Sequence, residues 1–444
     1  MNIAIVSLGC PKNQCDADVM VASLQKAGHM LVPHAEDAEV ILVNTCGFIE
    51  SAKQEAIENI LEACRYKEKN KQVKVVVTGC LAQRYGAELM NEIPECDAVV
   101  GIGGNMHIAK VLKRIQEGES VLLLPDKEDL PIAGERIIST PLHYAYLKIA
   151  EGCSNRCHYC AIPLIRGVLR SRPLEEAVAE AKWLAAQGVK EIIVVAQDIT
   201  AYGEDLTGER LLPKLLSELE QIEGIYWIRL LYAYPERISD ELIQVMANSK
   251  KIVPYIDMPI QHINNEVLAN MNRKGNRETV ISAIERIRAG VPEVCIRTTL
   301  ITGYPNETKE QFEGLCEFVE EYQIERLGCF AFSEEEGTVA AGMQGQVPVE
   351  ERAYRAEQIM QMQAGIMAQK QAGLVGTLQE VLCDEYNKEN GMWVCRTKYD
   401  APEIDGVCYV KSDHVLRQGE FYTVKIENSD VYDLYATLCE EDAS

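Results

Sequence analysis

The first third of the chain repeats one arrangement of hydrophobic and polar positions. Residues 1 to about 117 show an apolar, β-branched run, then a loop with Gly or Cys, then an amphipathic helical segment. This order is typical of a parallel α/β sheet. We therefore predict an N-terminal parallel α/β sheet domain over residues 1–124. Its expected strands are Ile3–Leu8, Val40–Val43, Val73–Val77 and Ala98–Val100.

A second α/β series begins at Tyr144 and has six expected strands with helices between them. Six strands with crossover helices predict a partial (α/β), TIM-like barrel with its chemistry at the carboxyl ends of the strands. We assign residues 139–370 to this domain and residues 125–138, which are rich in Pro and charge, to a linker. The expected strands are Tyr144–Ile149, Glu191–Ala196, Trp227–Tyr232, Val253–Met258, Val294–Ile301 and Arg326–Phe332.

The last part of the chain changes to period-2 alternation after a long helical segment, Val349–Gln371. Five short strands in so few residues predict a small antiparallel β-barrel resembling an OB-fold, over residues 371–444. The expected strands are Thr377–Cys383, Trp393–Lys398, Cys408–Lys411, Phe421–Glu427 and Leu434–Leu438.

Charge and cysteine content narrow the class of protein. The 44 Lys and Arg against 68 Asp and Glu give a net charge of −24, which disfavours a polyanionic partner and suits a basic one. The N-terminus lacks a basic segment, and no apolar run reaches the roughly 18 residues that span a bilayer, so we expect a cytoplasmic protein with no membrane partner. In that reducing compartment, 16 cysteines favour metal or cluster ligation over disulfides for those in loops.

Three cysteines fall within eight residues just past the first barrel strand, in Cys153-Ser-Asn-Arg-Cys157-His-Tyr-Cys160. A zinc site usually takes four ligands, and no fourth Cys lies nearby; His158 points elsewhere by its position. Three thiolates on a four-iron cluster leave one iron open to bind a ligand. Structural cysteines or a partial zinc knuckle are the alternatives.

Three further cysteines, Cys10, Cys46 and Cys80, each follow an apolar run by two or three residues. The carboxyl ends of parallel strands share one edge, so the three thiols are expected to converge. The adjacent glycines Gly9, Gly47 and Gly79 would let the backbone approach a bulky inorganic group. Coincidence is the alternative, and Cys15 is ambiguous, with packing favoured.

The Cys-x3-Cys-x2-Cys loop after a first barrel strand resembles the radical S-adenosylmethionine (SAM) superfamily. The resemblance implies that Cys153, Cys157 and Cys160 are catalytic ligands of a [4Fe-4S] cluster whose open iron chelates SAM. It also implies that Tyr159 packs on the adenine. With a second triad and a small β-domain, the whole chain resembles the methylthiotransferases of that superfamily.

That family resemblance implies a second [4Fe-4S] cluster on Cys10, Cys46 and Cys80, and identifies the C-terminal barrel as a TRAM domain. It further implies that one SAM is the methyl donor to cluster-held sulfur, that a second SAM is the radical source, and that a reductant protein is the external electron donor.

Polar residues at other strand ends are candidates for the SAM shell. By the resemblance, Gln197, Asp198, Arg229 and His262 would surround the methionyl and ribose groups, and Ile301 and Gly303 the adenine, with Glu307 supporting their turn. Each is equally well explained as a hydrogen-bonded residue at a strand end or an ordinary turn. Nothing in the pattern gives His262 a role in proton transfer.

The substrate is indicated by charge and by resemblance. Residues 374–444 hold 15 acidic and 6 basic residues, a net of −9, which is wrong for an RNA-binding barrel. The basic run Arg166–Arg172 could meet phosphates, but hydrogen bonding within its loop is the favoured interpretation.

Stretches such as Leu8-Gly-Cys-Pro-Lys-Asn13 and Pro259-Ile-Gln-His262 resemble the branch that methylthiolates the β-carbon of an aspartate in the basic small-subunit ribosomal protein S-twelve. RNA binding is not favoured. The alternatives are the tRNA adenosine branch, a non-catalytic iron–sulfur redox protein, and an acidic tail that is only a solvated surface.

Overall fold

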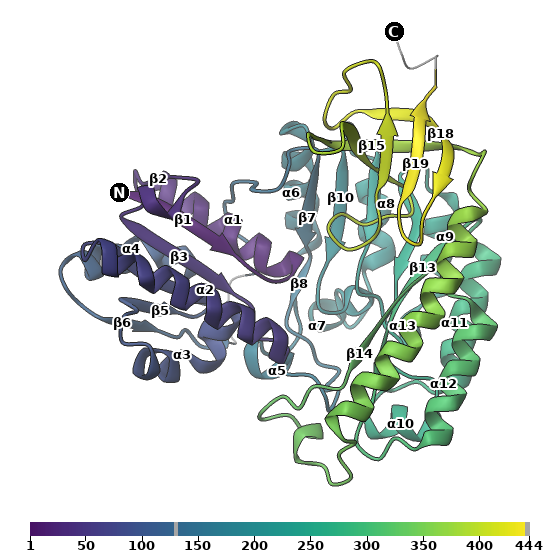
Figure 1. Ribbon diagram of the computed structural model, residues 1–444, viewed down its shortest axis with the longest axis horizontal. Helices are drawn as coiled ribbons and strands as arrows, with labels where there is room; N and C mark the ends of the chain where they lie inside the picture. Colours follow the sequence, from purple (N-terminus) through teal and green to yellow (C-terminus); the bar gives the residue numbers. More distant parts are fainter. Residues whose placement is uncertain (128–131, 440–444) are drawn as a thin grey trace.

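The computed structural model describes residues 1–127 and 132–439, which form three domains in the order expected (Figure 1). Parts of two predicted segments, 128–131 of the linker and 440–444 of the C-terminal domain, lie outside the described residues. No helix within the described ranges has the length and apolar content needed to cross a membrane.

The N-terminal domain is a six-stranded parallel sheet in the order β2-β1-β3-β4-β5-β6, which confirms the predicted class. Its central strands are buried because helices cover both faces, so they form continuous apolar runs. The edge strands β2 and β6 were not predicted, since two or three residues are too short to show a period. The strands are β1 (Asn2–Ser7), β2 (Met30–Leu31), β3 (Val40–Thr45), β4 (Lys74–Gly79), β5 (Ala98–Val100) and β6 (Val121–Leu123), and the helices are α1 (Pro11–Lys26), α2 (Glu50–Lys69), α3 (Cys80–Glu92) and α4 (Ile108–Gln116).

The central domain is an open six-stranded parallel sheet, β14-β13-β12-β11-β10-β7, and all six strands lie where the sequence predicted them. β7 and β14 are the two edges, so the barrel is partial. The strands are β7 (Tyr144–Lys148), β10 (Glu191–Val195), β11 (Trp227–Leu230), β12 (Ile252–Asp257), β13 (Cys295–Thr302) and β14 (Arg326–Ala331). The helices are α5 (Ile162–Ile165), α6 (Leu174–Ala186), α7 (Glu204–Thr207), α8 (Leu212–Glu220), α9 (Asp240–Asn248), α10 (Asn265–Asn270), α11 (Arg277–Gly290), α12 (Lys309–Tyr322) and α13 (Val349–Ala372).

The C-terminal domain is a closed barrel of five strands in the order β15-β16-β17-β19-β18. Four neighbouring pairs are antiparallel as expected, but β17 and β19 run parallel. The parallel pair closes the barrel, so no strand edge is left open. The strands are β15 (Leu378–Asn387), β16 (Met392–Thr397), β17 (Cys408–Lys411), β18 (Phe421–Ser429) and β19 (Leu434–Leu438).

The C-terminal barrel covers the amino ends of the central strands (Figure 1). Arg396 of β16 pairs at 2.7 Å with Glu191, the first residue of β10. Asp400 pairs at 2.6 Å with Arg326, the first residue of β14. The carboxyl ends of the same strands are therefore the ends left for chemistry.

Candidate active site

The three-cysteine loop leaves the carboxyl side of β7 through the short strand β8 (Ala150–Glu151), which pairs with β9 (Arg170–Ser171). Gly152 has φ +76°, and a side chain there would collide with the carbonyl of Val168, so only glycine permits this close pairing. The Cys153 N–H donates to the Gly167 carbonyl at 3.1 Å. The loop is thus tied down before its first thiol.

The thiols of Cys153, Cys157 and Cys160 lie close enough that the charge of Cys157 raises the pKa of the other two. Burial is the larger cause and raises the pKa of Cys153 to about 11, so this thiol keeps its proton until a metal displaces it. The Sγ of Cys157 lies 2.7 Å from the hydroxyl of Tyr234. His158 is turned away, with Nδ1 2.8 Å from the Asn270 carbonyl, as its position suggested.

Cys10, Cys46 and Cys80 converge at the carboxyl ends of β1, β3 and β4, which are neighbours in the sheet. Their electrostatic coupling shows the proximity, because the charge of Cys10 raises the pKa of both Cys46 and Cys80. Burial raises the pKa of Cys80 to about 12. Burial would also raise the pKa of Cys10, but Lys12 and Arg166 outweigh it and lower that pKa.

The glycines of this triad bring the loops together. A Cβ at Gly47 would lie 2.8 Å from the Leu81 Cα, and one at Gly79 would collide with the Thr45 carbonyl. Gly47 and Gly79 thus allow close contact between strand ends, and their approach to an inorganic group stays a prediction. That contact is what lets three thiols approach one another.

Arg166 links the two triads. It is 1% exposed and donates to the Sγ of Cys80 at 3.3 Å, to Asp16 at 2.9 Å and to Glu151 at 2.8 Å. Lys148 pairs with the same two carboxylates at 2.6 and 2.9 Å. Arg166 and Lys148 lower the pKa of Glu151 against the opposing effect of burial, so Glu151 is held as a carboxylate.

The predicted pair at the end of β10 lies beside the three-cysteine loop. Gln197 donates to Glu151 at 2.7 Å, and its own oxygen is buried with no partner among the described residues. Asp198 accepts from Asn155 at 2.8 Å and from Arg237 at 2.9 Å. Gln197 therefore keeps a free acceptor, whereas Asp198 is occupied in holding the loop.

A second group of predicted residues gathers around the turn after β13. Glu307 accepts from the Gly303 N–H at 2.9 Å and from Arg355 at 2.7 Å, so it holds the turn. His262 is fully buried; its Nδ1 accepts from the Asn264 N–H, and its Nε2 lies 3.7 Å from Glu307. Tyr159 and Ile301 pack in one apolar cluster with Tyr304 and Phe332.

Arg229 lies elsewhere, in the contact with the C-terminal barrel. Its guanidinium donates to Glu191 at 2.7 Å and to the Lys398 carbonyl at 2.9 Å. Its expected place beside SAM is therefore corrected: Arg229 helps to dock a neighbouring domain. The sequence around Arg229 could not predict this contact, because its partner residues lie far away along the chain, on β10 and on the segment after β16.

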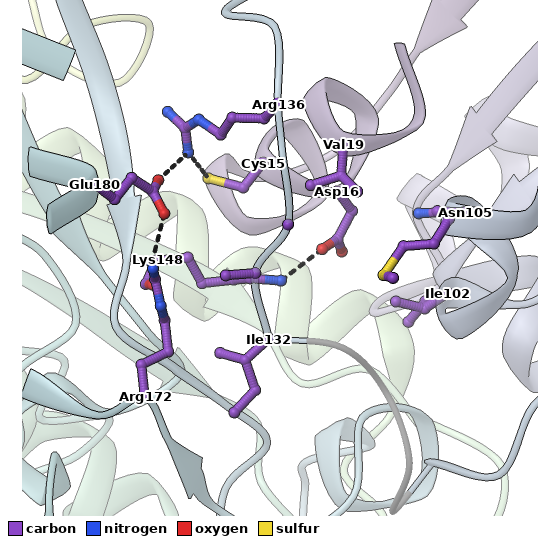
Figure 2. Close-up of a pocket in the computed structure, with 13 residues that line it drawn as sticks. Cys15, Asp16, Val19, Ile102, Asn105, Ile132, Arg136, Lys148, Arg172 and Glu180 are labelled. Atoms are coloured by element: carbon purple, nitrogen blue, oxygen red, sulfur yellow. Dashed lines mark hydrogen bonds and ion pairs between the residues drawn. The ribbon is translucent and has the colours of Figure 1, made fainter. Parts of the chain in front are cut away.

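The basic run after the three-cysteine loop is structural, as favoured. Arg172 donates to the Lys148 carbonyl at 3.0 Å and to Glu180 at 2.7 Å, beside the buried Arg166. Figure 2 shows a neighbouring pocket between α1 and the barrel, where Arg136 donates to Glu180 and to the Sγ of Cys15. Cys15 is 3% exposed and burial raises its pKa to about 12, which supports its packing role.

Sequence reasoning missed three charged residues at this edge. Asp16, Lys148 and Lys12 stand next to recognised motifs, but no role was assigned to them. The available signal was a charge within a buried element, because Lys148 ends an apolar strand and Asp16 lies on a helix face packed against the barrel.

Within the described residues, no three His, Cys, Asp or Glu side chains are arranged to hold a single metal ion. Each triad instead offers three convergent thiols, the donor set of an iron–sulfur cluster.

Three family models match the chain, one to each domain. Residues 2–101 match the uncharacterized protein family UPF0004, residues 147–319 the radical SAM superfamily, and residues 375–439 the TRAM domain. Among solved structures, the radical SAM methyltransferase TsrM from Kitasatospora setae covers 74% of this chain and 72% of its own, with a TM-score of 0.54 and 15% identity. That similarity shows the fold.

Curated relatives match over the whole length. The ribosomal protein uS12 methylthiotransferase RimO of Clostridium tetani is 47% identical over 438 residues, 98% of either chain. The protein of that name from Clostridioides difficile is 46% identical over 446 residues, 99% of either chain. With two thiol triads on adjoining domains and a TRAM barrel behind them, this chain belongs to the RimO family of radical SAM methylthiotransferases.

Proposed function

We propose that this chain methylthiolates the β-carbon of an aspartate residue in the small-subunit ribosomal protein uS12, and that it does so in the cytoplasm. The names of its relatives supply the substrate class. The observation that carries the chemistry is the meeting of two thiol triads from different domains at one place.

The two triads lie on adjoining domains whose contact beside Cys80 is buried. Cys80 packs against Ala161 and Ile165, which directly follow the three-cysteine loop. Arg166 reaches from that loop to Cys80 on one side and to Glu151 on the other. A reaction that needs a radical at one centre and sulfur at the other requires this adjacency.

We assign Cys153, Cys157 and Cys160 to the radical SAM cluster and Cys10, Cys46 and Cys80 to an auxiliary one. Bound there, two [4Fe-4S] clusters would supply, with SAM and an external electron donor, a carbon radical at one triad and transferable sulfur at the other. Tyr159 and Ile301 offer an apolar face suited to an adenine, and Gln197 offers an acceptor beside the loop.

The protein's own residues provide position and exclude water. Lys148, Arg166 and Glu151 form a buried network that joins the N-terminal domain to the three-cysteine loop. The TRAM barrel covers the amino ends of the central strands. The uS12 segment that carries the aspartate would therefore enter from the carboxyl ends of these strands. An aspartate β-carbon has no acidic proton, which is why hydrogen-atom removal suits it and proton abstraction does not.

His262 is unsuited to act as a base on the substrate. Burial and the nearby Arg355 lower its pKa to about 3, and its Nδ1 accepts a backbone hydrogen bond. Its Nε2 lies 3.7 Å from Glu307 and makes no hydrogen bond among the described residues. We therefore propose that His262 packs beside this turn as a neutral residue.

The test is anaerobic modification of two offered substrates. Reconstituted protein with SAM and a reductant is given purified uS12 or bulk tRNA in separate reactions, and both are analysed by mass spectrometry. A methylthio group gained by an aspartate of uS12 alone is expected. A gain on tRNA adenosine alone would overturn the proposed substrate, and reactions without reductant are the control.

A further inference from the structure

Lys12 reaches out of the N-terminal domain into the mouth of the central barrel. It follows Cys10 at the start of α1, yet its Nζ lies 3.5 Å from the Ala196 carbonyl and 3.4 Å from the centre of the Tyr232 ring. Ala196 and Tyr232 stand at the carboxyl ends of β10 and β11. The ammonium thus lies at the carboxyl ends of two barrel strands, on a residue two positions after Cys10.

The Lys12 ammonium has few hydrogen-bond acceptors and no paired carboxylate among the described residues. The side chain is 6% exposed, and an ammonium carries three donors. In residues 1–127 and 132–439 its one hydrogen-bond acceptor is the Ala196 carbonyl, at the outer limit of distance, and no carboxylate lies within 4.0 Å. A buried ammonium so poorly paired is costly unless an anion completes the site.

The carboxylates that could have paired with Lys12 are held by other bases. Glu151 and Asp16 form ion pairs with Lys148 and Arg166. Asp257, next to Tyr232, pairs with Arg297 at 3.0 Å. Lys12 is therefore left without a paired carboxylate among the described residues, although its charge also acts on the neighbouring thiol of Cys10.

The backbone under the Tyr232 ring is strained in a way that positions it. Tyr232 has φ +69°, a left-handed conformation that is unfavourable for an aromatic residue and concentrates at functional sites. Its N–H donates to Asp257 at 3.2 Å and its carbonyl accepts from Ile199, which hold the conformation. The ring then supports the Lys12 ammonium from one side through a cation–π contact.

We infer that Lys12 binds the side-chain carboxylate of the substrate aspartate. The inference rests on the proposed function, because it supplies the reason why the substrate residue carries a carboxylate next to the reacting carbon. A charge-assisted bond would fix the β-carbon between the two triads. It would also select against a neutral adenine base, which has no group to pair with the ammonium.

The experiment measures binding as well as turnover. Reconstituted wild-type protein, Lys12→Met and Lys12→Arg are titrated with uS12 and with uS12 in which the modified aspartate is replaced by asparagine. Iron content and the rate of SAM cleavage without substrate are measured for each. Lys182→Met removes one positive charge from an exposed position on α6 and is the matched control.

Wild type and Lys182→Met are expected to bind the aspartate form about 10-fold or more tightly than the asparagine form. Lys12→Met should bind both forms equally, and Lys12→Arg should keep part of the preference. Loss of SAM cleavage in Lys12→Met would overturn the inference and assign the lysine to SAM itself.

A wild type that does not distinguish the two forms would also overturn the inference, whatever the variants do. Failure of wild type to methylthiolate uS12 at all is a separate result, seen by mass spectrometry, and it would overturn the proposed function.

Discussion

The guanidinium of Arg166 lies 3.3 Å from the Sγ of Cys80 and 2.8 Å from the carboxylate of Glu151. Cys80 belongs to the N-terminal domain and Glu151 to the loop before Cys153, so one side chain spans the boundary between the triads. With Lys148, which pairs with Asp16 and Glu151, Arg166 therefore helps to hold the N-terminal domain against the three-cysteine loop.

Replacing Arg166 should therefore be costly. Arg166→Met leaves Lys148 as the one basic partner of Asp16 and Glu151 among the described residues, and breaking such a buried network costs about 3–5 kcal/mol of the free energy of unfolding. Anaerobic urea unfolding measures it. Arg114→Met, which breaks an exposed pair with Glu119, should cost about 1 kcal/mol or less. If the two variants lowered the free energy of unfolding equally, the buried network would contribute no more to stability than an exposed ion pair.

The two triads should fail in different ways. Cys157→Ala is expected to abolish SAM cleavage, because it removes a ligand of the radical cluster. Cys46→Ala should leave SAM cleavage intact and stop sulfur insertion. The measurements are 5′-deoxyadenosine by chromatography and methylthiolated uS12 by mass spectrometry, and Cys64→Ala, in the apolar core of the N-terminal sheet, should retain both. If Cys157→Ala and Cys46→Ala both still modify uS12, the two-cluster assignment is wrong.

The buried His262 should make stability fall in acid. Its pKa is lowered from 6.5 to about 3 by burial, so the unfolded chain binds a proton that the folded chain does not between these pH values. The stability it contributes is complete above about pH 6.5 and falls as pH drops, by about 1.4 kcal/mol per unit. His262→Asn, which can keep the bond from Asn264, should flatten the pH dependence of the unfolding free energy by one proton. An unchanged slope would contradict a neutral buried imidazole.

The acidic charges of the TRAM barrel should change the rate of association with the basic uS12 and leave kcat unchanged. Asp384, Asp400 and Asp405 are already used to dock the barrel, so only exposed acids are free to act. Reversing Glu385, Glu389 and Asp413 to Lys should slow association with uS12 most at low salt, with kcat unchanged, because the barrel lies at the amino ends of the strands. Reversing Glu62, Glu68 and Glu92 on the N-terminal domain is the control. Association that does not depend on salt or on the TRAM charges would leave the acidic tail as a solvated surface.

Much of the architecture follows from local pattern. The six central strands lie where apolar periodicity predicted them, whereas the short strands β2, β6, β8 and β9 were not predicted. The carboxyl ends of neighbouring parallel strands share one edge, so the sequence pattern alone predicts that the thiols of Cys10, Cys46 and Cys80 lie close together. Spacing within eight residues did the same for Cys153, Cys157 and Cys160.

The domain order, the sheets and the two sets of three cysteines can thus be predicted from the sequence, since these features depend on neighbours along the chain. Tertiary structure alone decided that Arg229 docks the TRAM barrel, that Arg166 joins the triads, and that Lys12 enters the barrel mouth without a carboxylate. The physical reason is that a charged side chain takes its role from partners supplied by other domains, and periodicity along one segment carries no record of them.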